Sequence, residues 1–263
     1  MKGTDMKTSV QITEFYRTAA KNKCRMAPHR MLISGIFAGA FIALGAFGSQ
    51  IVGSSVADAG LARLFGALVF PVGLTLVLCV GTELFTGNSL LILPLLEKEV
   101  KGIDVLKSWF FVYLGNLIGS LMIAVLAVHS GLPSLFGGAL AETMASAAAA
   151  KCALTIPAAL VRGILCNILV CLAVWVSFAA DELAGRIAGL YLPTMLFVLC
   201  GFEHSIANMY FIPAGMMVSA SSGASLTGFL LHNLIPVTIG NVIGGGCFVA
   251  AGFYLLFSDH GKN

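Results

Sequence analysis

Long runs of apolar residues alternate with short polar segments along the whole chain. Between Arg30 and Asp58 the sequence has 27 consecutive uncharged residues, and comparable runs recur up to Asp259. A membrane-spanning helix needs about 20 residues with few or no charges. The pattern therefore predicts six membrane passages, over residues 30–55, 63–96, 107–130, 155–180, 187–221 and 225–257.

Composition narrows the class of protein. Hydrophobic residues make up 58% of the chain and charged residues only 10%, against about 25% charged residues in an ordinary soluble domain. The mean hydropathy is +0.95. These values exclude a soluble globular enzyme and make the lipid bilayer the expected surroundings. The net charge of +3 is too small to indicate a nucleic-acid partner.

The Lys and Arg residues at the ends of the passages predict the orientation. With both termini inside, twelve of the 15 Lys and Arg residues lie on the inner face, and only Arg63, Lys151 and Arg162 lie outside. Cytoplasmic loops of membrane proteins carry an excess of Lys and Arg. We therefore expect a multi-pass protein of the inner membrane with both termini in the cytoplasm.

The passages divide the chain into five expected segments: a cytoplasmic segment 1–29, a first three-helix unit 30–130, an extracytoplasmic loop 131–154, a second three-helix unit 155–258 and a cytoplasmic tail 259–263. The first 30 residues are polar and basic, so no cleavable signal is expected. From Ser9 to Arg25, apolar and basic residues fall on different sides of a helix, which predicts an amphipathic helix at the membrane interface. A solvated extension is the alternative. Residues 145–150 in the outer loop are typical of a short helix.

The sequence lacks the usual catalytic and metal-binding motifs. It has no HExxH, P-loop, GxSxG or dinucleotide-binding pattern. The seven cysteines are odd in number, have no CxxC spacing and fall mostly inside the passages. This is typical of packing residues rather than of disulfides or metal ligands. We therefore expect no enzyme activity, no cofactor and no metal.

Two motifs recur in the two halves of the chain. Residues 81–88 and 201–208, which are 120 positions apart, share the pattern G-x-E-x4-N, and G-N-x-I-G recurs at 115–119 and 240–244. Two echoes in the same order indicate a duplicated three-helix unit. Because such a unit crosses the membrane an odd number of times, its copy lies inverted about a pseudo-two-fold axis in the membrane plane.

The motifs at 81–88 and 201–208 are expected to interrupt the second and fifth helices near the midplane. Unwound backbone is tolerated in a membrane only where it is buried or lines a cavity, so a polar chamber is expected there. An ionisable group inside a membrane favours a functional role for His204 over a purely structural one. Thr86 offers a hydroxyl opposite this histidine. Glu83 and Glu203 are expected to brace the breaks by accepting from their amides, and a cation site is the alternative.

The paired motifs resemble the formate/nitrite transporter family. The resemblance rests on residues 83–88 in a broken second helix and 203–208 in a broken fifth helix, extends over the whole chain and is closest to the hydrosulfide-channel branch. It implies an all-α membrane protein with six transmembrane helices, inverted three-helix repeats and an aquaporin-like protomer. It also implies a homopentamer in which each protomer has its own pore.

The resemblance further implies roles for individual residues. The pore centre matches His204 and Thr86. A cytoplasmic apolar constriction matches Leu74, Leu84 and Phe197. The opposite constriction matches Phe70 and Phe85. The outer mouth and vestibule, where anions are attracted, match Lys151, Asn167 and Asn208. Judged from the residues alone, such Leu and Phe side chains ordinarily pack, and such a lysine ordinarily lies at the surface.

The sequence leaves three functions open. The first is a channel for small monovalent anions of weak acids, with hydrosulfide first and formate or nitrite close behind. Dehydration of a bare anion costs on the order of tens of kcal/mol in the idealised limit, so His204 is expected to share a proton or donate a hydrogen bond. The second is an aquaporin-like channel for a neutral solute, which would want Asn-Pro-Ala where the chain has Gly87-Asn88-Ser89 and Ala207-Asn208-Met209. The third is a non-transporting membrane scaffold.

Overall fold

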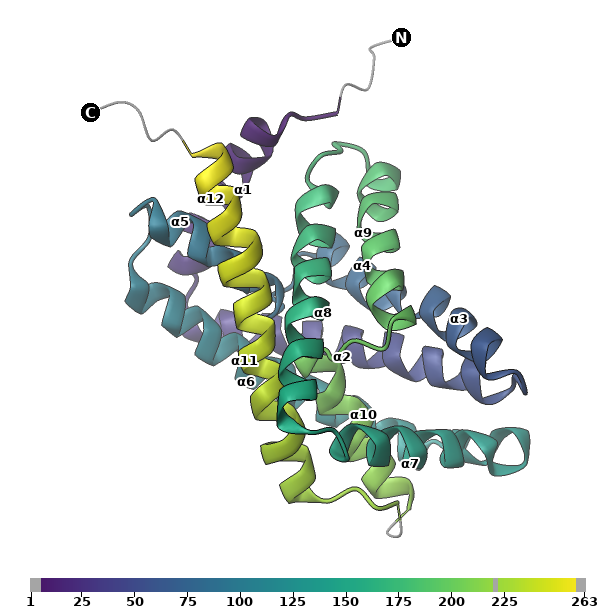
Figure 1. Ribbon diagram of the computed structural model, residues 1–263. Coiled ribbons are helices and arrows are strands. Elements are labelled where there is room, and N and C mark those ends of the chain that lie inside the picture. Colours follow the sequence, from purple (N-terminus) through teal and green to yellow (C-terminus); the bar gives the residue numbers. More distant parts are fainter. Residues whose placement is uncertain (1–5, 220–221, 259–263) are drawn as a thin grey trace.

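The protein is all-helical throughout the part of the chain that the structure describes. The computed structural model describes residues 6–219 and 222–258, so Lys2, residues 220–221 and the expected tail 259–263 lie outside them. In chain order the elements (Figure 1) are α1 (Ser9–Arg25), α2 (Pro28–Ser54), α3 (Ala59–Val69), α4 (Pro71–Val80), η1 (Gly87–Leu91), α5 (Ile92–Leu96), α6 (Gly102–His129), η2 (Leu132–Gly138), α7 (Ala139–Cys152), α8 (Ile156–Ser177), α9 (Leu183–Leu199), α10 (Ser205–Val218), η3 (Gly228–Leu234), α11 (Ile235–Val242), η4 (Ile243–Ala250) and α12 (Ala251–Phe257).

Side chains at the helix starts explain several of these boundaries. Thr8 caps α1 in a capping box with Gln11, and the Asp58 carboxylate accepts a 2.8 Å hydrogen bond from the backbone N–H of Leu61 at the start of α3. Pro28 occupies the first turn of α2. Such residues satisfy the free amides of a first helical turn, or have no amide to satisfy.

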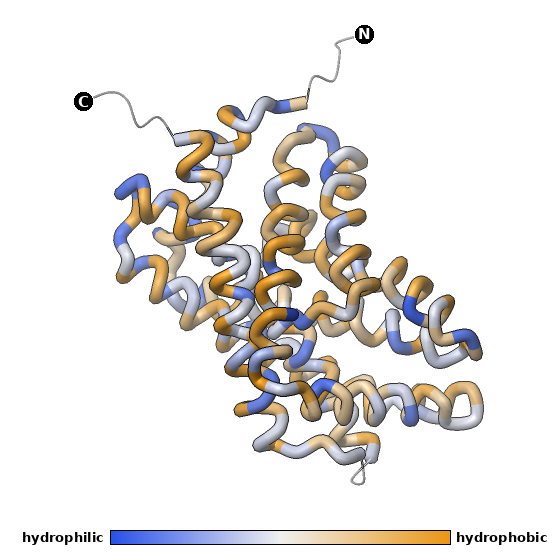
Figure 2. Tube along the Cα trace, viewed as in Figure 1, coloured by the Kyte–Doolittle hydropathy of each residue, from blue (hydrophilic) through white to orange (hydrophobic). Residues whose placement is uncertain are grey.

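Five helical stretches are long and apolar enough to cross a membrane. They are Pro28–Ser54, Ala59–Val80, Gly102–His129, Ile156–Ser177 and Gly228–Phe257. Figure 2 shows apolar residues along most of the helical length and hydrophilic residues gathered mainly at helix ends and turns. The shorter helices α9 and α10 together occupy the region of the expected fifth passage. The chain is therefore an all-helical membrane protein.

Both interruptions lie inside the repeated motifs. Helix α4 ends at Gly81, which has φ +80°, and helical structure resumes at Gly87. Helix α9 ends before Gly201, which has φ +71°, and α10 begins at Ser205. Glycine adopts this left-handed conformation without the steric cost that other residues meet. The two motif glycines thus terminate the helices at the places where the sequence predicts breaks.

Close contact between helix backbones holds the two long pairs together. Helix α2 packs along α6, and α8 packs along α11, beside which it runs in Figure 1. A Cβ atom built on Gly119 of α6 would lie 1.9 Å from the carbonyl oxygen of Ile36, and one built on Gly244 would lie 2.2 Å from that of Ile164. Any side chain there would force the helices apart.

Helix α1 is fixed to the side of the bundle where α12 ends (Figure 1). Arg17 forms two hydrogen bonds, of 2.8 and 2.6 Å, with the carboxylate of Glu97, and these raise the pKa of Arg17. The Tyr16 ring is buried against Trp175 and Phe178 at centroid distances of 6.1 and 6.2 Å. Helix α1 is therefore amphipathic: its aromatic side chains pack against the bundle, and its charged side chains form ion pairs beside that contact.

Candidate functional site

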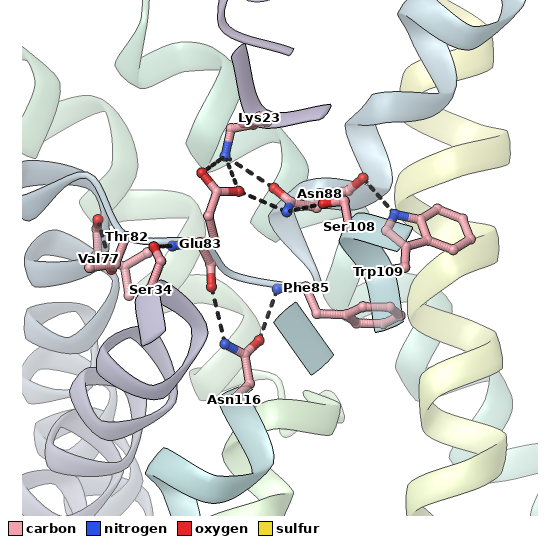
Figure 3. Close-up of polar contacts among 10 residues, drawn as sticks. All are labelled: Lys23, Ser34, Val77, Thr82, Glu83, Phe85, Asn88, Ser108, Trp109 and Asn116. Carbon is pink, nitrogen blue, oxygen red and sulfur yellow. Dashed lines mark hydrogen bonds and ion pairs between the residues drawn. The ribbon is translucent and has the colours of Figure 1, made fainter. Parts of the chain in front are cut away.

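The first helix break is organised around the carboxylate of Glu83. This side chain is 5% exposed, and the Lys23 Nζ of α1 lies 2.8 Å from both of its oxygens. The Asn88 side-chain amide donates to the same carboxylate at 2.8 Å. Figure 3 shows the three side chains pointing toward one another. A buried carboxylate of this kind is retained only when paired and hydrogen-bonded, and both conditions are met here.

A buried asparagine satisfies the unwound backbone of this break. The Asn116 side chain of α6 accepts from the N–H of Phe85 at 2.9 Å and donates to the carbonyl of Glu83 at 3.1 Å (Figure 3). It also donates to the carbonyl of Gly35 at 2.8 Å. These backbone groups have lost their helical partners or lie beside the gap. One side chain therefore ties the break to both α2 and α6.

The second break repeats the carboxylate cluster of the first. Lys151 of α7 pairs with Glu203 at 2.9 Å, and the Asn208 amide donates to Glu203 at 2.6 Å. Asn233 also donates to this carboxylate, at 3.1 Å. Glu203 is 3% exposed. In each half, therefore, a lysine from the helix that precedes the unit neutralises the glutamate of the break.

The second break also repeats the asparagine support. Asn241 accepts from the N–H of Ser205 at 2.9 Å and donates to the carbonyls of Glu203 at 3.0 Å and Gly163 at 2.8 Å. These three distances match those of Asn116 within about 0.1 Å. The two supporting asparagines are the second residues of the G-N-x-I-G echoes.

The predicted reason for the two glutamates needs correction. The Glu83 and Glu203 carboxylates do not accept from the amides of the breaks, because Asn116 and Asn241 already do. The carboxylates instead bind lysines and neighbouring asparagines. The sequence contained the signal, since G-N-x-I-G recurs in both halves, but its asparagine was not read as the support of the breaks.

His204 and Thr86 meet where the two breaks approach each other. The His204 Nε2 lies 2.9 Å from the Thr86 hydroxyl oxygen, and both side chains are buried, at 3% and 0% exposure. His204 Nδ1 accepts a 3.1 Å hydrogen bond from the N–H of Ala207. Because Nδ1 acts as an acceptor, the neutral ring carries its hydrogen on Nε2 and donates it to Thr86. The imidazole thus caps α10 and holds the threonine hydroxyl.

Next to this pair, the polar side chain that contacts the break differs in size between the two halves. It is the larger Asn167 at the first break and the smaller Ser120 at the second. The Asn167 amide donates to the carbonyl of Thr86 at 3.1 Å, and the Ser120 hydroxyl reaches the carbonyl of Ile206, 120 residues after Thr86, at 3.4 Å. The space for Asn167 is left by Gly245, where a Cβ atom would lie 2.5 Å from the asparagine nitrogen. The predicted vestibule position of Asn167 therefore needs correction, because this residue is fully buried behind Thr86.

A cavity of about 280 Å³ leads to the histidine, and we call it the vestibule. Its wall contains His204, Asn208, Lys151, Phe70 and Phe197. The two phenyl rings meet edge to face, with centroids 5.4 Å apart, and the Phe197 ring stacks on the imidazole at 5.8 Å. The aromatic pair therefore lies in the vestibule wall beside the imidazole that contacts Thr86.

This arrangement changes the predicted grouping of the apolar residues. Phe197 lies beside Phe70, which the resemblance assigned to the opposite constriction. Phe85, predicted to partner Phe70, packs instead against Trp109 and Tyr113 at 5.9 and 4.7 Å. In an unwound segment, consecutive side chains such as those of Leu84 and Phe85 do not follow helical spacing. Their directions therefore cannot be predicted from the sequence alone. Leu74 and Leu84 are 2% and 4% exposed within the apolar core.

Similarity to known proteins assigns the family. A family model described as "Formate/nitrite transporter" matches residues 10–255. The chain belongs to the formate/nitrite transporter family. Members of this family are channels or transporters and not enzymes.

Individual relatives and structures agree with this assignment. The chain is 36% identical to a "Probable formate transporter" of Methanothermobacter thermautotrophicus over 97% of this chain and 98% of that protein. It is 35% identical to the formate channel FocA of Haemophilus influenzae over 90% of each. A solved "Pentameric formate channel with formate bound" is 34% identical and superposes with a TM-score of 0.78 over 88% of this chain and 97% of that one. An "FNT family ion channel" is 28% identical, with a TM-score of 0.83 over 93% and 98%.

In this transporter-family chain, Lys151 lies in the vestibule wall but is not a free cation. It is ion-paired with Glu203, its side chain is 19% exposed, and its ammonium lies 5.2 Å from the centroid of the Phe211 ring. The paired carboxylate offsets the attraction for anions that the sequence predicts for Lys151. Lys23 at the other break, which sequence analysis did not single out, is offset in the same way by Glu83.

Two arginines of the vestibule wall were missed as site residues. Arg63 of α3 and Arg162 of α8 both line the cavity. Their signal in the sequence was that the Lys and Arg distribution assigned them, with Lys151, to the side opposite the termini. Among the described residues no group of three or more His, Cys, Asp and Glu side chains is arranged to hold a metal ion.

Proposed function

We propose that this protein is a membrane channel through which small monovalent anions of weak acids pass. The observation that carries the proposal is the 2.9 Å contact between Thr86 and His204 at the meeting of two helix breaks, beside an apolar pair of phenyl rings. Membership of the family, whose formate channels are similar over most of this chain, supports the same conclusion. Formate is the first substrate to test. Hydrosulfide and nitrite, which share its charge and small size, belong to the same proposed class.

In the proposed mechanism Thr86 and His204 act together as a hydrogen-bond donor. The imidazole Nε2–H donates to the threonine oxygen, which leaves the threonine hydroxyl hydrogen free to donate to an anion. Hydrogen bonds to a charged acceptor are about twice as strong as neutral ones. They disperse the charge of an anion that has lost water between the phenyl rings, so that it does not cross the apolar region bare.

Free polar atoms around the breaks support a path for a polar species. Asn167 Oδ1, Ser205 Oγ and Asn208 Oδ1 are buried and have no hydrogen-bond partner within residues 6–219 and 222–258. A buried polar group without a partner costs about 1–3 kcal/mol. Contacts with a passing molecule or its hydrating water would offset that cost.

The proposed architecture is six membrane passages in two inverted three-helix units, in an aquaporin-like protomer. The matched geometry of Asn116 and Asn241 supports the repeat, and α9 with α10 supplies the fifth passage, which completes the six. We propose a homopentamer with a pore in each protomer, on the example of the similar pentameric formate channel. The distribution of Lys and Arg supports an inner-membrane protein with both termini in the cytoplasm, residues 131–154 outside and α1 at the interface.

Formate flux in proteoliposomes tests the proposal. His204→Phe should abolish or alter the flux, because phenylalanine lacks the nitrogen that holds Thr86. His129→Phe is the matched control, since His129 lies at the exposed end of α6. Water and glycerol permeability measured in the same vesicles tests the neutral-solute alternative. A wild-type protein that carries no anion, or a His204→Phe protein with unchanged anion flux, contradicts the proposal.

A further inference from the structure

Three positive side chains from distant parts of the chain meet in the wall of the vestibule. Arg63 comes from α3, Lys151 from the end of α7 and Arg162 from α8. These are also the three Lys and Arg residues that the sequence assigns to the side opposite the termini. All three line the vestibule, the cavity that leads to His204.

The two arginines carry charge that no carboxylate in the described structure offsets. Lys151 is matched by Glu203 at 2.9 Å. Arg63 and Arg162 form no ion pair and no side-chain hydrogen bond within residues 6–219 and 222–258, and both are exposed. The vestibule wall therefore holds two uncompensated positive charges, while its lysine is neutralised.

The fold does not need the guanidinium of Arg162. Ser34, which precedes Gly35, uses its hydroxyl to accept from the N–H of Glu83 at 2.9 Å. Arg162, which precedes Gly163, accepts a 3.3 Å hydrogen bond from the corresponding N–H of Glu203 with its backbone carbonyl oxygen. The N–H of the break glutamate therefore has an acceptor in both halves. In the second half the acceptor is a backbone carbonyl, so the Arg162 side chain is not used for this bond.

Arg63 reaches over the second break. A Cβ atom built on Gly201 would lie 3.3 Å from the Nη2 of Arg63. Gly201 itself lines the vestibule with Phe70 and Phe197. The guanidinium therefore lies beside the unwound segment that carries Glu203 and His204, in the same cavity wall as the aromatic pair.

We propose that Arg63 and Arg162 form an anion-capture site, in which a small monovalent anion is held with part of its water before it meets Phe70 and Phe197. The proposal rests on the channel function proposed above. Guanidinium groups present forked donors that suit a carboxylate or another oxyanion. The cavity of about 280 Å³ has room for such an anion and several waters, each of which occupies about 30 Å³. Dehydration then begins at the phenyl rings and not at the membrane surface.

The expected strength of the site follows from two screened charges. At about 6 Å in water, two unit charges together raise the local concentration of a monovalent anion about sevenfold at roughly 10 mM ionic strength, and about threefold at roughly 150 mM. The half-saturating anion concentration for entry from that side should change by these factors when the charges are removed.

The test is saturation of labelled-formate influx into right-side-out membrane vesicles at the two ionic strengths, with efflux measured in parallel. In the double variant Arg63→Gln with Arg162→Gln, the half-saturating concentration should rise about sevenfold at the low salt and about threefold at the high salt. The double variant Arg63→Lys with Arg162→Lys keeps the charges and should stay within about twofold of wild type. Lys101→Gln, which removes a positive charge at the start of α6 outside the vestibule, should change nothing.

The outcomes separate this proposal from the channel function. Saturable influx in wild type with a salt-dependent loss in the glutamine variant, restored by lysine, supports the capture site. Wild-type influx that does not saturate, an unchanged half-saturating concentration in the glutamine variant, or an equal change on both sides of the membrane overturns it. A wild-type protein without formate flux overturns the channel function instead.

Discussion

Removing the side chain of Asn116 tests whether a helix break depends on one buried amide. This residue is fully buried and makes three hydrogen bonds, to the N–H of Phe85 and to the carbonyls of Glu83 and Gly35. In Asn116→Ala, the first two of these backbone groups lose a partner in a place that water cannot reach. The Gly35 carbonyl keeps its helical acceptor role within α2.

The magnitude follows from the two stranded groups. A buried donor or acceptor left without a partner costs about 1–3 kcal/mol, so Asn116→Ala should lower the free energy of unfolding by about 4 kcal/mol. Asn241→Ala strands the N–H of Ser205 and the carbonyl of Glu203 in the same way. Because the distances match, the two variants should be destabilised equally, within about 1 kcal/mol.

The assay is equilibrium unfolding of purified protein in mixed micelles of mild and denaturing detergent, followed by circular dichroism. Asn22→Ala is the matched control, since Asn22 is an exposed residue of α1 and should lose almost nothing. The reasoning is refuted by a loss below about 1 kcal/mol in either buried variant. A large difference between the two would refute the claim that the breaks are supported alike.

Three further predictions concern packing, the constriction and α1. Gly119→Ala should prevent close contact of α2 with α6 and abolish stable folding, whereas Gly252→Ala, with nothing within 4 Å of the added carbon, should stabilise α12 by about 0.5–1 kcal/mol; thermal melting compares the two. Leu84→Val should widen the apolar path and raise formate flux, and unchanged flux in an assembled protein would remove Leu84 from the path. Burial raises the pKa of the Cys24 thiol to about 11, so the thiolate is scarce near neutrality and maleimide labelling of this residue should be slow below pH 9 and accelerate toward pH 11. Glu97→Gln, which releases Arg17 from the bundle, should speed the labelling, and a rate unaffected by that change would show that α1 is not held by this pair.

The sequence predicted the elements whose signals are local. Uncharged runs located the long helices, and the repeated G-x-E-x4-N located both breaks, because a glycine with positive φ and a buried carboxylate leave a recognisable pattern. The contact between Thr86 and His204 also followed from facing the two motifs across a pseudo-axis. Its role in transport stays a prediction.

What the sequence did not reveal depends on where side chains point in unwound backbone. Phe85 follows Leu84 directly but turns to Trp109 and Tyr113, and Asn167 fills a space that exists only because residue 245 is glycine. Lys23 reaches Glu83 from 60 residues away. Such contacts arise between elements that are distant in the chain, so spacing along one element cannot predict them.

One echo was overlooked and connects α1 with α7. Lys23-Cys24 lies in the last turn of the helix before the first unit, and Lys151-Cys152 ends the helix before the second. Each lysine pairs with the glutamate of the break that follows. The correspondence between the two halves of the chain therefore begins one helix earlier than the three-helix unit predicted from the membrane passages.

The residues at the centre of the site differ between the two halves of the chain, whereas the residues that support the breaks are the same. The frame of lysine, glutamate and asparagine is the same in both halves, while the positions held within it differ: Leu84 corresponds to His204, and Thr86 to Ile206. A designer who wishes to alter which solute is admitted can therefore rewrite these four positions without redesigning the scaffold. Evolutionary divergence between the two halves would follow the same rule: the four inner residues change, while the supporting lysines, glutamates and asparagines stay.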